Sequence, residues 1–382
     1  MNKKLLAKLA FTTIALTMAN TGHAGLITFD NVDYATTVVG AAQTTYNAAV
    51  DELLSQFEDQ VNANAGTGDL KLSEYFGALG NSTSIAASGL GASYHNDFEF
   101  FTIGGGAGFG GQLAPGKTLT DLQDGIQGTL SGVGASASVT LGAKAGLIFK
   151  SPWFWGLVDP TRLKGYVGLF FFPINLAGFG SGNVTSVSAI GQYQLMKPMS
   201  MGLGMLKWNG VSLSSGIRFS KFSLDASYSK TVTQSESMDV GGTPVTTSLT
   251  TPLEIELSIA STTTTIPFEA STSVRLLYFL SLMAGTAFDF NVGSSSGGVT
   301  APDTTVTVDH GGSAAFTGDN TTTADATVDT AFANGEGNPT FLNWRGFIGA
   351  QIEFGVGGIF VNFEKSILKS QYGVNVGLNL FY

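Results

Sequence analysis

Apolar and polar residues alternate along the last twelve positions of the chain, QYGVNVGLNLFY. Every second side chain is apolar, and small or amide residues occupy most of the positions between. Successive side chains of a β-strand point to opposite faces, so this period of two predicts a strand with one apolar face. The apolar set comprises Tyr372, Val374, Val376, Leu378, Leu380 and Tyr382.

The same alternation recurs along the rest of the chain and predicts thirteen candidate strands. They span 85–94, 97–108, 133–149, 163–173, 184–196, 203–219, 222–232, 251–260, 264–276, 279–292, 342–355, 358–365 and 372–382. Charged residues within these segments fall on the face opposite the apolar set, so we expect them to line a common interior. They are Lys144, Arg218, Asp225, Glu254, Glu256, Glu269, Arg275, Asp289, Arg345, Glu353 and Glu364.

Composition shows that the chain is poor in charge and rich in glycine. Only 12% of its residues are charged, about half the share of an average soluble protein, and 51 are Gly. Acidic residues outnumber basic ones by 28 to 18, which leaves no basic surface for phosphate and excludes nucleic acid as a partner. The chain has no Cys, so it has no disulfides and no Cys-based metal site.

Residues 1–24 have the pattern of a secretory signal peptide. Lys3, Lys4 and Lys8 flank the start of the apolar run LAFTTIALTMA, and the small residues of GHA end at Ala24, after which we expect cleavage. No later stretch reaches the roughly 18 to 20 apolar residues that a transmembrane helix requires. An exported apolar chain without such a helix crosses a membrane as a closed β-barrel, in which every strand has two partners.

We therefore predict an all-β fold, a transmembrane antiparallel β-barrel over residues 85–382 with about twelve strands and a range of ten to fourteen. Alternation also fits a soluble β-sandwich. The small and polar character of the opposite face, and the aromatic cluster at 151–160 with Trp153 and Trp155, favour contact with lipid. With the C-terminus in the periplasm, the stretch 293–340 becomes a long external loop, and the sequence FSKF at 219–222 is expected to form a tight turn.

The N-terminal segment, residues 25–84, differs from the rest because its apolar residues recur at spacings of three and four. Asp51 and Glu52 lie on the opposite side of this stripe, which predicts an amphipathic helix. We expect the helix at the periplasmic mouth of the barrel; a plug in the lumen and pairing with another copy are the alternatives. The stripe contains Val39, Ala42, Tyr46, Val50, Leu53, Phe57 and Val61.

Together, the signal peptide, the alternating strands and the terminal aromatic strand resemble those of Gram-negative-type outer-membrane β-barrel proteins. The resemblance covers roughly residues 85–382. It implies outer-membrane lipid as the surroundings and the barrel assembly machinery as a partner, which in this class recognises the last strand. By this resemblance, Tyr372, Val374, Val376, Leu378, Leu380 and Tyr382 form the assembly signal.

Motifs for chemistry are weak, and we assign no catalytic residue, metal site or cofactor. GAGFGG, residues 106–111, matches a dinucleotide fingerprint but opens no helix, so glycines in a crowded strand are the better interpretation. His95 and His310 are expected to be surface residues, although His95 leaves a hydrolase hypothesis open. The Asp and Asn residues of the 293–340 loop lack the spacing of a calcium-binding loop.

Our first functional hypothesis is a porin-like passive pore for small hydrophilic solutes. Seven acidic against four basic interior charges predict a mild preference for cations. A second hypothesis is a surface anchor or adhesin with a filled barrel, whose 293–340 loop binds an external ligand. A third is a channel for hydrophobic compounds, which resembles the fatty-acid channel group in its N-terminal helical segment. The Asn-Pro-Ala signature of that group is absent, because Thr340 follows Asn338 and Pro339.

Overall fold

The structure is a computed structural model that describes residues 27–35, most of 43–55, 72–90, 100–113, 136–148, 159–176, 180–201, 205–240, 243–301, 304–310, 321–328 and 334–382. The elements are β1 (Ile27–Asp33), α3 (Leu72–Ser88), β2 (Phe101–Gln112), β3 (Ser136–Ile148), η2 (Pro160–Arg162), β4 (Leu163–Leu176), β5 (Gly180–Gln194), β6 (Met199–Met201), β7 (Leu206–Val240), β8 (Thr243–Leu276), β9 (Leu280–Thr300), β10 (Thr304–Asp309), β11 (Thr321–Val328), β12 (Gly335–Gly337), β13 (Leu342–Phe354), β14 (Gly357–Ser366) and β15 (Gln371–Phe381). No helix among these residues is long and apolar enough to cross a membrane.

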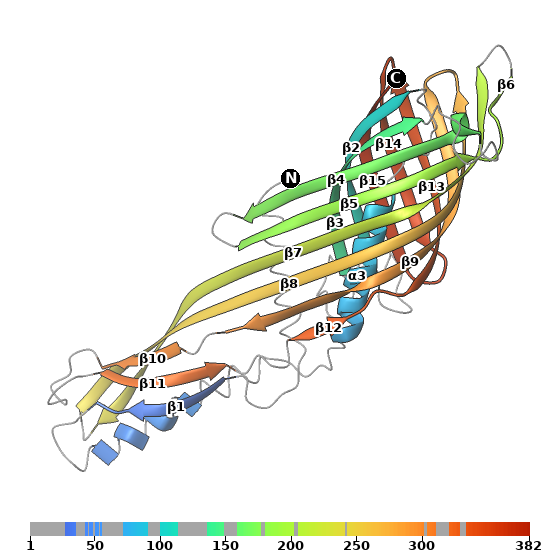
Figure 1. The fold of residues 1–382 in the computed structure, drawn as a ribbon. Helices are drawn as coiled ribbons and strands as arrows, with labels where there is room; N and C mark the ends of the chain where they lie inside the picture. Colours follow the sequence, from blue (N-terminus) through green and yellow to red (C-terminus); the bar gives the residue numbers. More distant parts are fainter. Residues whose placement is uncertain are drawn as a thin grey trace.

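Ten strands form a closed antiparallel ring (Figure 1). Their order is β8, β7, β5, β4, β3, β2, β15, β14, β13 and β9, and the pairing of β9 with β8 closes the ring. The last strand lies beside the first strand of the ring, since Phe381 is in register with Thr102. The predicted antiparallel barrel is thus confirmed, with a strand number inside the predicted range.

Ten strands replace the thirteen candidate segments for two structural reasons. The candidate strand 85–94 overlaps the end of α3, so its first residues are helical. Residues 91–99 lie outside the described part of the chain. The other reason is that 203–219 and 222–232 belong to the single strand β7, as 251–260 and 264–276 belong to β8. The predicted turn at 219–222 is wrong, because Ser220 and Lys221 pair with Thr263 and Thr262 in an unbroken ladder.

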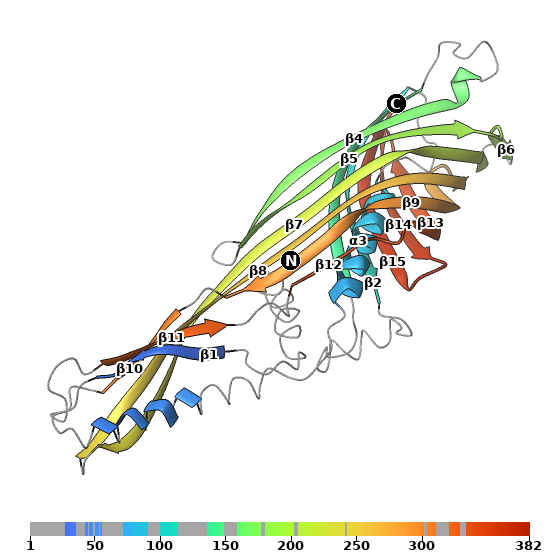
Figure 2. The same ribbon diagram turned by 60° about the horizontal axis from the view of Figure 1, so that its bottom comes forward.

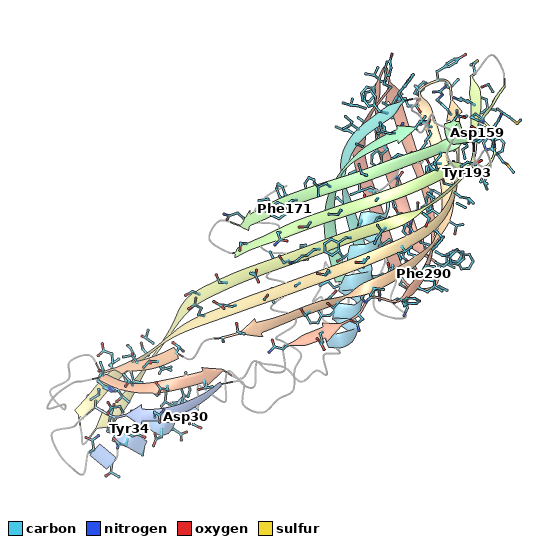
Figure 3. The ribbon with its side chains drawn as sticks, in the orientation of Figure 1. Asp30, Tyr34, Asp159, Phe171, Tyr193 and Phe290 are labelled. Atoms are coloured by element: carbon cyan, nitrogen blue, oxygen red, sulfur yellow. The ribbon has the colours of Figure 1, made fainter. Side chains whose placement is uncertain are left out.

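Side chains of the ring alternate between an apolar outer face and a polar inner face. On β15, Val376 and Leu378 are exposed outward, while Asn375 and Asn379 are buried inside. Figure 3 shows Phe171 on β4, and its side chain is 65% exposed. This continuous apolar exterior on a ring without free edges is what a barrel surrounded by lipid requires.

The two rims of the ring differ in their connections. At the rim of Tyr382, which we call the near rim, residues 277–279 link β8 to β9 and residues 355–356 link β13 to β14. At the opposite or far rim, the β7–β8 hairpin extends well beyond the other strands (Figures 1 and 2). Asp159 and Tyr193 mark the near rim in Figure 3, and Asp30 and Tyr34 lie at the opposite end of the molecule.

A second packed unit, which we call the head, surrounds the tip of the β7–β8 hairpin. It comprises this tip, β10, β11, β1 and the helical residues between 43 and 55. β10 pairs with β8 and with β11, and β1 pairs with the other edge of β11. Its core contains Tyr46, Val50, Leu54, Val245, Leu249, Val306, Val308, Ala324 and Ala326.

The head corrects two sequence-based expectations. The helix predicted over 39–61 is present in its described residues, with Tyr46 and Val50 buried and Asp51 and Glu52 exposed. It packs in the head beyond the far rim, at the opposite end of the molecule from Tyr382, and not across a mouth of the barrel as expected. The stretch 293–340 is also more than a loop, because it includes the end of β9, β10, β11 and β12. Residues 1–24, the predicted signal peptide, and His95, Trp153 and Trp155 lie outside the described residues.

Candidate functional site

The lumen of the barrel contains the helix α3. It contacts β2, β3, β8, β9 and β15, strands from opposite sides of the ring (Figure 2). All residues from Ala78 of α3 to Leu90, just beyond its end, are buried. The helix starts near the far rim, where Phe76 meets Gly297 of β9, and reaches mid-barrel, where Leu90 meets Gly106 of β2. The part of the lumen along α3 is therefore filled by the chain itself.

Glycines of β2 allow this close packing of helix and wall. A Cβ atom added at Gly108 would lie 1.8 Å from the carbonyl oxygen of Ala86, and one at Gly110 would lie 2.1 Å from that of Ser82. Any side chain at either position would displace the helix. The GAGFGG motif thus lies in a strand crowded by another element, as the sequence predicted.

Polar side chains join α3 to the wall. Ser84 donates a hydrogen bond of 2.7 Å to Asn291, and its hydroxyl lies 3.0 Å from that of Thr265. Nearer the far rim, Asn81 donates to Gln112 over 2.9 Å. Ser88 donates to the carboxylate of Glu364. These bonds satisfy polar groups that burial would otherwise destabilise, so they fix the rotation and depth of the helix.

Beside α3, charged residues from five strands form one buried ion-pair cluster. The guanidinium of Arg345, which is 0% exposed, contacts Asp289 at 2.6 Å and Glu364 at 2.9 Å and also bonds Glu269. Arg218 lies 2.8 Å from Glu269 and 3.7 Å from Asp289. Buried charges of this kind require each partner, because removing one leaves the others uncompensated.

This cluster joins the barrel wall to the helix. Two guanidiniums face three carboxylates, and Glu364 accepts from both Ser88 of α3 and Asn375 of β15, the latter over 3.0 Å. The sequence places the five charged residues on the inner face, and the structure brings them together. Sequence reasoning missed their contact with α3, since a serine in a helix carries no signal for a carboxylate partner elsewhere in the chain.

The other predicted lumen charges lie apart from this cluster. Arg275 pairs with Glu353 at 3.3 Å towards the near rim. Asp225, Glu254 and Glu256 have exposed side chains near the far rim. Asp225 shares the outer face of β7 with Ile217, and Glu254 and Glu256 share the outer face of β8 with Phe268, so their predicted place in the lumen is wrong. Asp225 and Glu256 line an open groove of about 650 Å³ there, together with Gly180 and Asn334. Lys144 lies in β3 between Gly104 and Gly168, and its side chain is outside the described part.

The head contains a buried polar cluster that the sequence did not indicate. The Tyr46 hydroxyl lies 2.5 Å from Nε2 of His310 and also contacts the hydroxyl of Thr322. Burial raises the pKa of Tyr46 to about 12 and lowers the pKa of His310 to about 4, although the carboxylate of Asp309 acts in the opposite direction on His310. His310 is 1% exposed, so its expected surface position is wrong.

The closed antiparallel ring, its exposed apolar exterior and its polar interior define a transmembrane β-barrel, here with an occupied lumen. The family described as Lsa36-like matches residues 31–382. The chain belongs to this family.

Solved structures with some likeness include other β-barrels. The translocator domain of autotransporter NalP from Neisseria meningitidis is 11% identical with a TM-score of 0.27, covering 78% of this chain and 93% of that one. The transport unit of autotransporter AIDA-I from Escherichia coli is 9% identical with a TM-score of 0.30, covering 81% and 99%. The CymD monoaromatic hydrocarbon channel is 8% identical with a TM-score of 0.21, covering 75% and 90%. No curated protein matches the chain.

Proposed function

We propose that this chain is an outer-membrane barrel that anchors a surface head and whose lumen is closed by α3. The observation that carries the proposal is the burial of α3 between opposite walls of the ring. An open porin needs a continuous aqueous path, whereas here helix, hydroxyls and ion pairs fill the middle of the barrel. If the lumen is closed, the barrel serves as an anchor that displays the head beyond the far rim.

Orientation follows from the connections. Outer-membrane barrels have short periplasmic turns and longer extracellular loops. The near rim has the connections 149–162, 195–205, 277–279 and 355–356, whereas the far rim has the two longest ones, 113–135 and 301–341. We therefore infer that the near rim faces the periplasm and that the β7–β8 hairpin carries the head outward. The predicted external ligand would meet the head, in which β10 and β11 come from the 293–340 stretch.

Conductance of the purified chain in planar bilayers tests the closed lumen. We expect the intact chain to insert without current steps, because α3 blocks the path. A variant lacking residues 27–90 should give current steps, since α3 is the part of the described chain that fills the lumen. Steady porin-like current from the intact chain, with the same size as from the shortened variant, would show that α3 does not close the barrel.

A cation-preferring passage for small hydrophilic solutes is a second candidate, available when α3 leaves the lumen. The excess of carboxylates over guanidiniums in the buried cluster favours it. In the variant lacking 27–90, Glu364→Gln should shift the reversal potential towards lower cation preference. Glu254→Gln is the matched control, because that side chain is exposed near the far rim. A shift with Glu254→Gln alone would place selectivity at the far rim and not in the cluster.

A further inference from the structure

The path of the chain through the molecule has an unusual order. β1 and the helical residues 43–55 belong to the head, beyond the far rim. α3 then runs down the lumen from the far rim to mid-barrel. The chain continues at the near rim, where the amide of Phe100 donates to the carbonyl of Tyr382 over 2.7 Å and β2 begins. The described part of the chain between the head and the first barrel strand, α3, therefore lies in the lumen.

We propose that the barrel passes its own N-terminal segment through its lumen to the cell surface, and that α3 is the part that stays behind as the closure. This inference rests on the proposed membrane orientation. If the near rim faces the periplasm, the first barrel strand starts on that side while β1 is outside. Residues 27–71 must then have crossed the membrane, and the lumen is the route that the chain still occupies.

The lumen suits the passage of a chain no wider than one helix. The carbonyls of Ala86 and Ser82 lie so close to Gly108 and Gly110 of β2 that an added Cβ atom would overlap them. Because α3 also contacts β8 and β9 across the lumen, a segment much wider than this helix would not fit. The contacts of α3 with the wall include hydroxyls and amides, such as Ser84 with Asn291, which water can replace during movement. The chain has no Cys, so no disulfide can fold the segment into a wider loop before it passes.

Folding of the head gives the passage a direction. Once outside, β1 pairs with β11, and Tyr46, Val50 and Leu54 become buried against Val306 and its neighbours. Burial of apolar side chains favours this arrangement over a segment left in the periplasm. Retention of α3 follows when its serines reach Asn291 and Glu364.

Single-cysteine labelling on intact cells tests where each segment lies, because the natural chain has no thiol. Asp30→Cys reports on β1, Pro244→Cys on the hairpin tip and Lys197→Cys on the near rim, and all three native side chains are exposed. With a membrane-impermeant maleimide, we expect the first two to react on intact cells. Lys197→Cys should react only after the cells are opened.

The labelling outcomes separate this inference from the proposed function. Reaction of Pro244→Cys on intact cells, with Asp30→Cys protected until lysis, would overturn the passage but leave the displayed hairpin. Reaction of Lys197→Cys alone on intact cells would reverse the orientation and overturn both.

A larger side chain on the inner wall, which narrows the lumen beside α3, tests the route through the lumen. In the Asp30→Cys background, Gly108→Val places atoms where the Ala86 carbonyl lies, so surface labelling should fall at least tenfold while labelling of Pro244→Cys is retained. Gly191→Val is the matched control, since a Cβ there meets nothing closer than the Ser215 carbonyl at 3.8 Å. Unchanged labelling of Asp30→Cys in an assembled Gly108→Val barrel would overturn the lumen route.

A second variant leaves the barrel wall unchanged, in case Gly108→Val prevents assembly. A small epitope-tagged domain closed by one disulfide is fused ahead of Ile27, and its version with both cysteines changed to serine is the control. We expect the epitope on intact cells only for the serine version, because the oxidised domain is wider than a helix. Equal surface exposure of the two versions would contradict passage through the lumen.

Discussion

Arg345 is the side chain on which the buried cluster depends most. It contacts Glu269, Asp289 and Glu364 and is fully buried. Arg345→Met should therefore lower the free energy of unfolding by about 3–5 kcal/mol, because carboxylates would stay buried without their shared cation. Urea unfolding of the barrel in detergent micelles measures this loss.

The matched control for Arg345 is Arg275, whose guanidinium is partly exposed and pairs with Glu353 at 3.3 Å. Arg275→Met should cost about 1 kcal/mol or less, as expected for an ion pair that water screens. Equal losses for the two substitutions would mean that the cluster does not stabilise the barrel more than a pair at its rim.

His310 should make the head sensitive to acid. Its pKa in the folded head is about 4, below the usual value near 6.5, so the unfolded state binds a proton first as the pH falls. The stabilisation is present above pH 6.5 and is lost as the pH falls towards 4, by roughly 2–3 kcal/mol in total. Hydrogen exchange of β10 and β11 across this interval measures the loss of protection.

The control for this pH dependence is His310→Gln, which keeps a polar side chain but does not titrate between pH 4 and 7. Its head should lose less protection on acidification than that of the natural chain. The same loss in both would assign the acid sensitivity to carboxylates such as Asp309 and not to the imidazole.

At the scale of elements, the alternation of side chains predicts the strands but not their ends. β7 has 35 residues and β8 has 34, where a membrane crossing needs about ten. The sequence-based prediction divided β7 at the expected tight turn 219–222, and it also divided β8 between residues 260 and 264. The apolar positions change from odd to even between Phe219 and Phe222, and only the pairing with β5 and β8 shows that the chain does not reverse there.

The helix in the lumen, α3, was harder to predict from the sequence than the strands were. LSEYFGALGNSTSIAAS has no continuous apolar stripe, because its surroundings are a polar lumen and a glycine-lined wall. An amphipathic pattern reveals a helix that packs on an apolar core, as Tyr46 and Val50 do in the head. A helix of Gly, Ala and Ser with polar partners on several strands lacks this signal.

A proline at residue 221 distinguishes the observed continuous strand from a turn. Lys221 pairs with Thr185 on one side and Thr262 on the other, so Lys221→Pro removes a ladder hydrogen bond in a central strand. We expect a loss of about 2 kcal/mol or more in unfolding experiments. Lys221→Ala should cost far less, and a proline as harmless as alanine would indicate a flexible connection at this point.

The whole molecule contains two packed units whose surfaces suit different surroundings, water for the head and lipid for the barrel. The head buries its aliphatic core among β8, β10, β11 and the helical residues 43–55, while the barrel exposes its apolar face and buries its charges. Sequence reasoning identified the barrel because its alternation extends over most of the chain. It missed the head because the two segments that form it, 27–55 and 304–328, are far apart in the sequence. They come together only in the folded chain, around the tip of the β7–β8 hairpin.

The two units should therefore unfold separately. Changing Tyr46, Val50 and Leu54 together to serine removes the buried face of the head helix, at about 2–5 kcal/mol for each large apolar side chain. The sum, about 6–15 kcal/mol, is as large as the whole stability of a typical domain, so the head should unfold. Limited proteolysis in liposomes should then cleave within 304–328, while the heat-modifiable gel mobility of the barrel stays unchanged.

The control is the double variant Asp51→Ser and Glu52→Ser, on the exposed face of the same helix, which should leave the head resistant to the protease. Loss of the folded barrel in the triple variant would instead show that the head and the membrane unit form one cooperative structure.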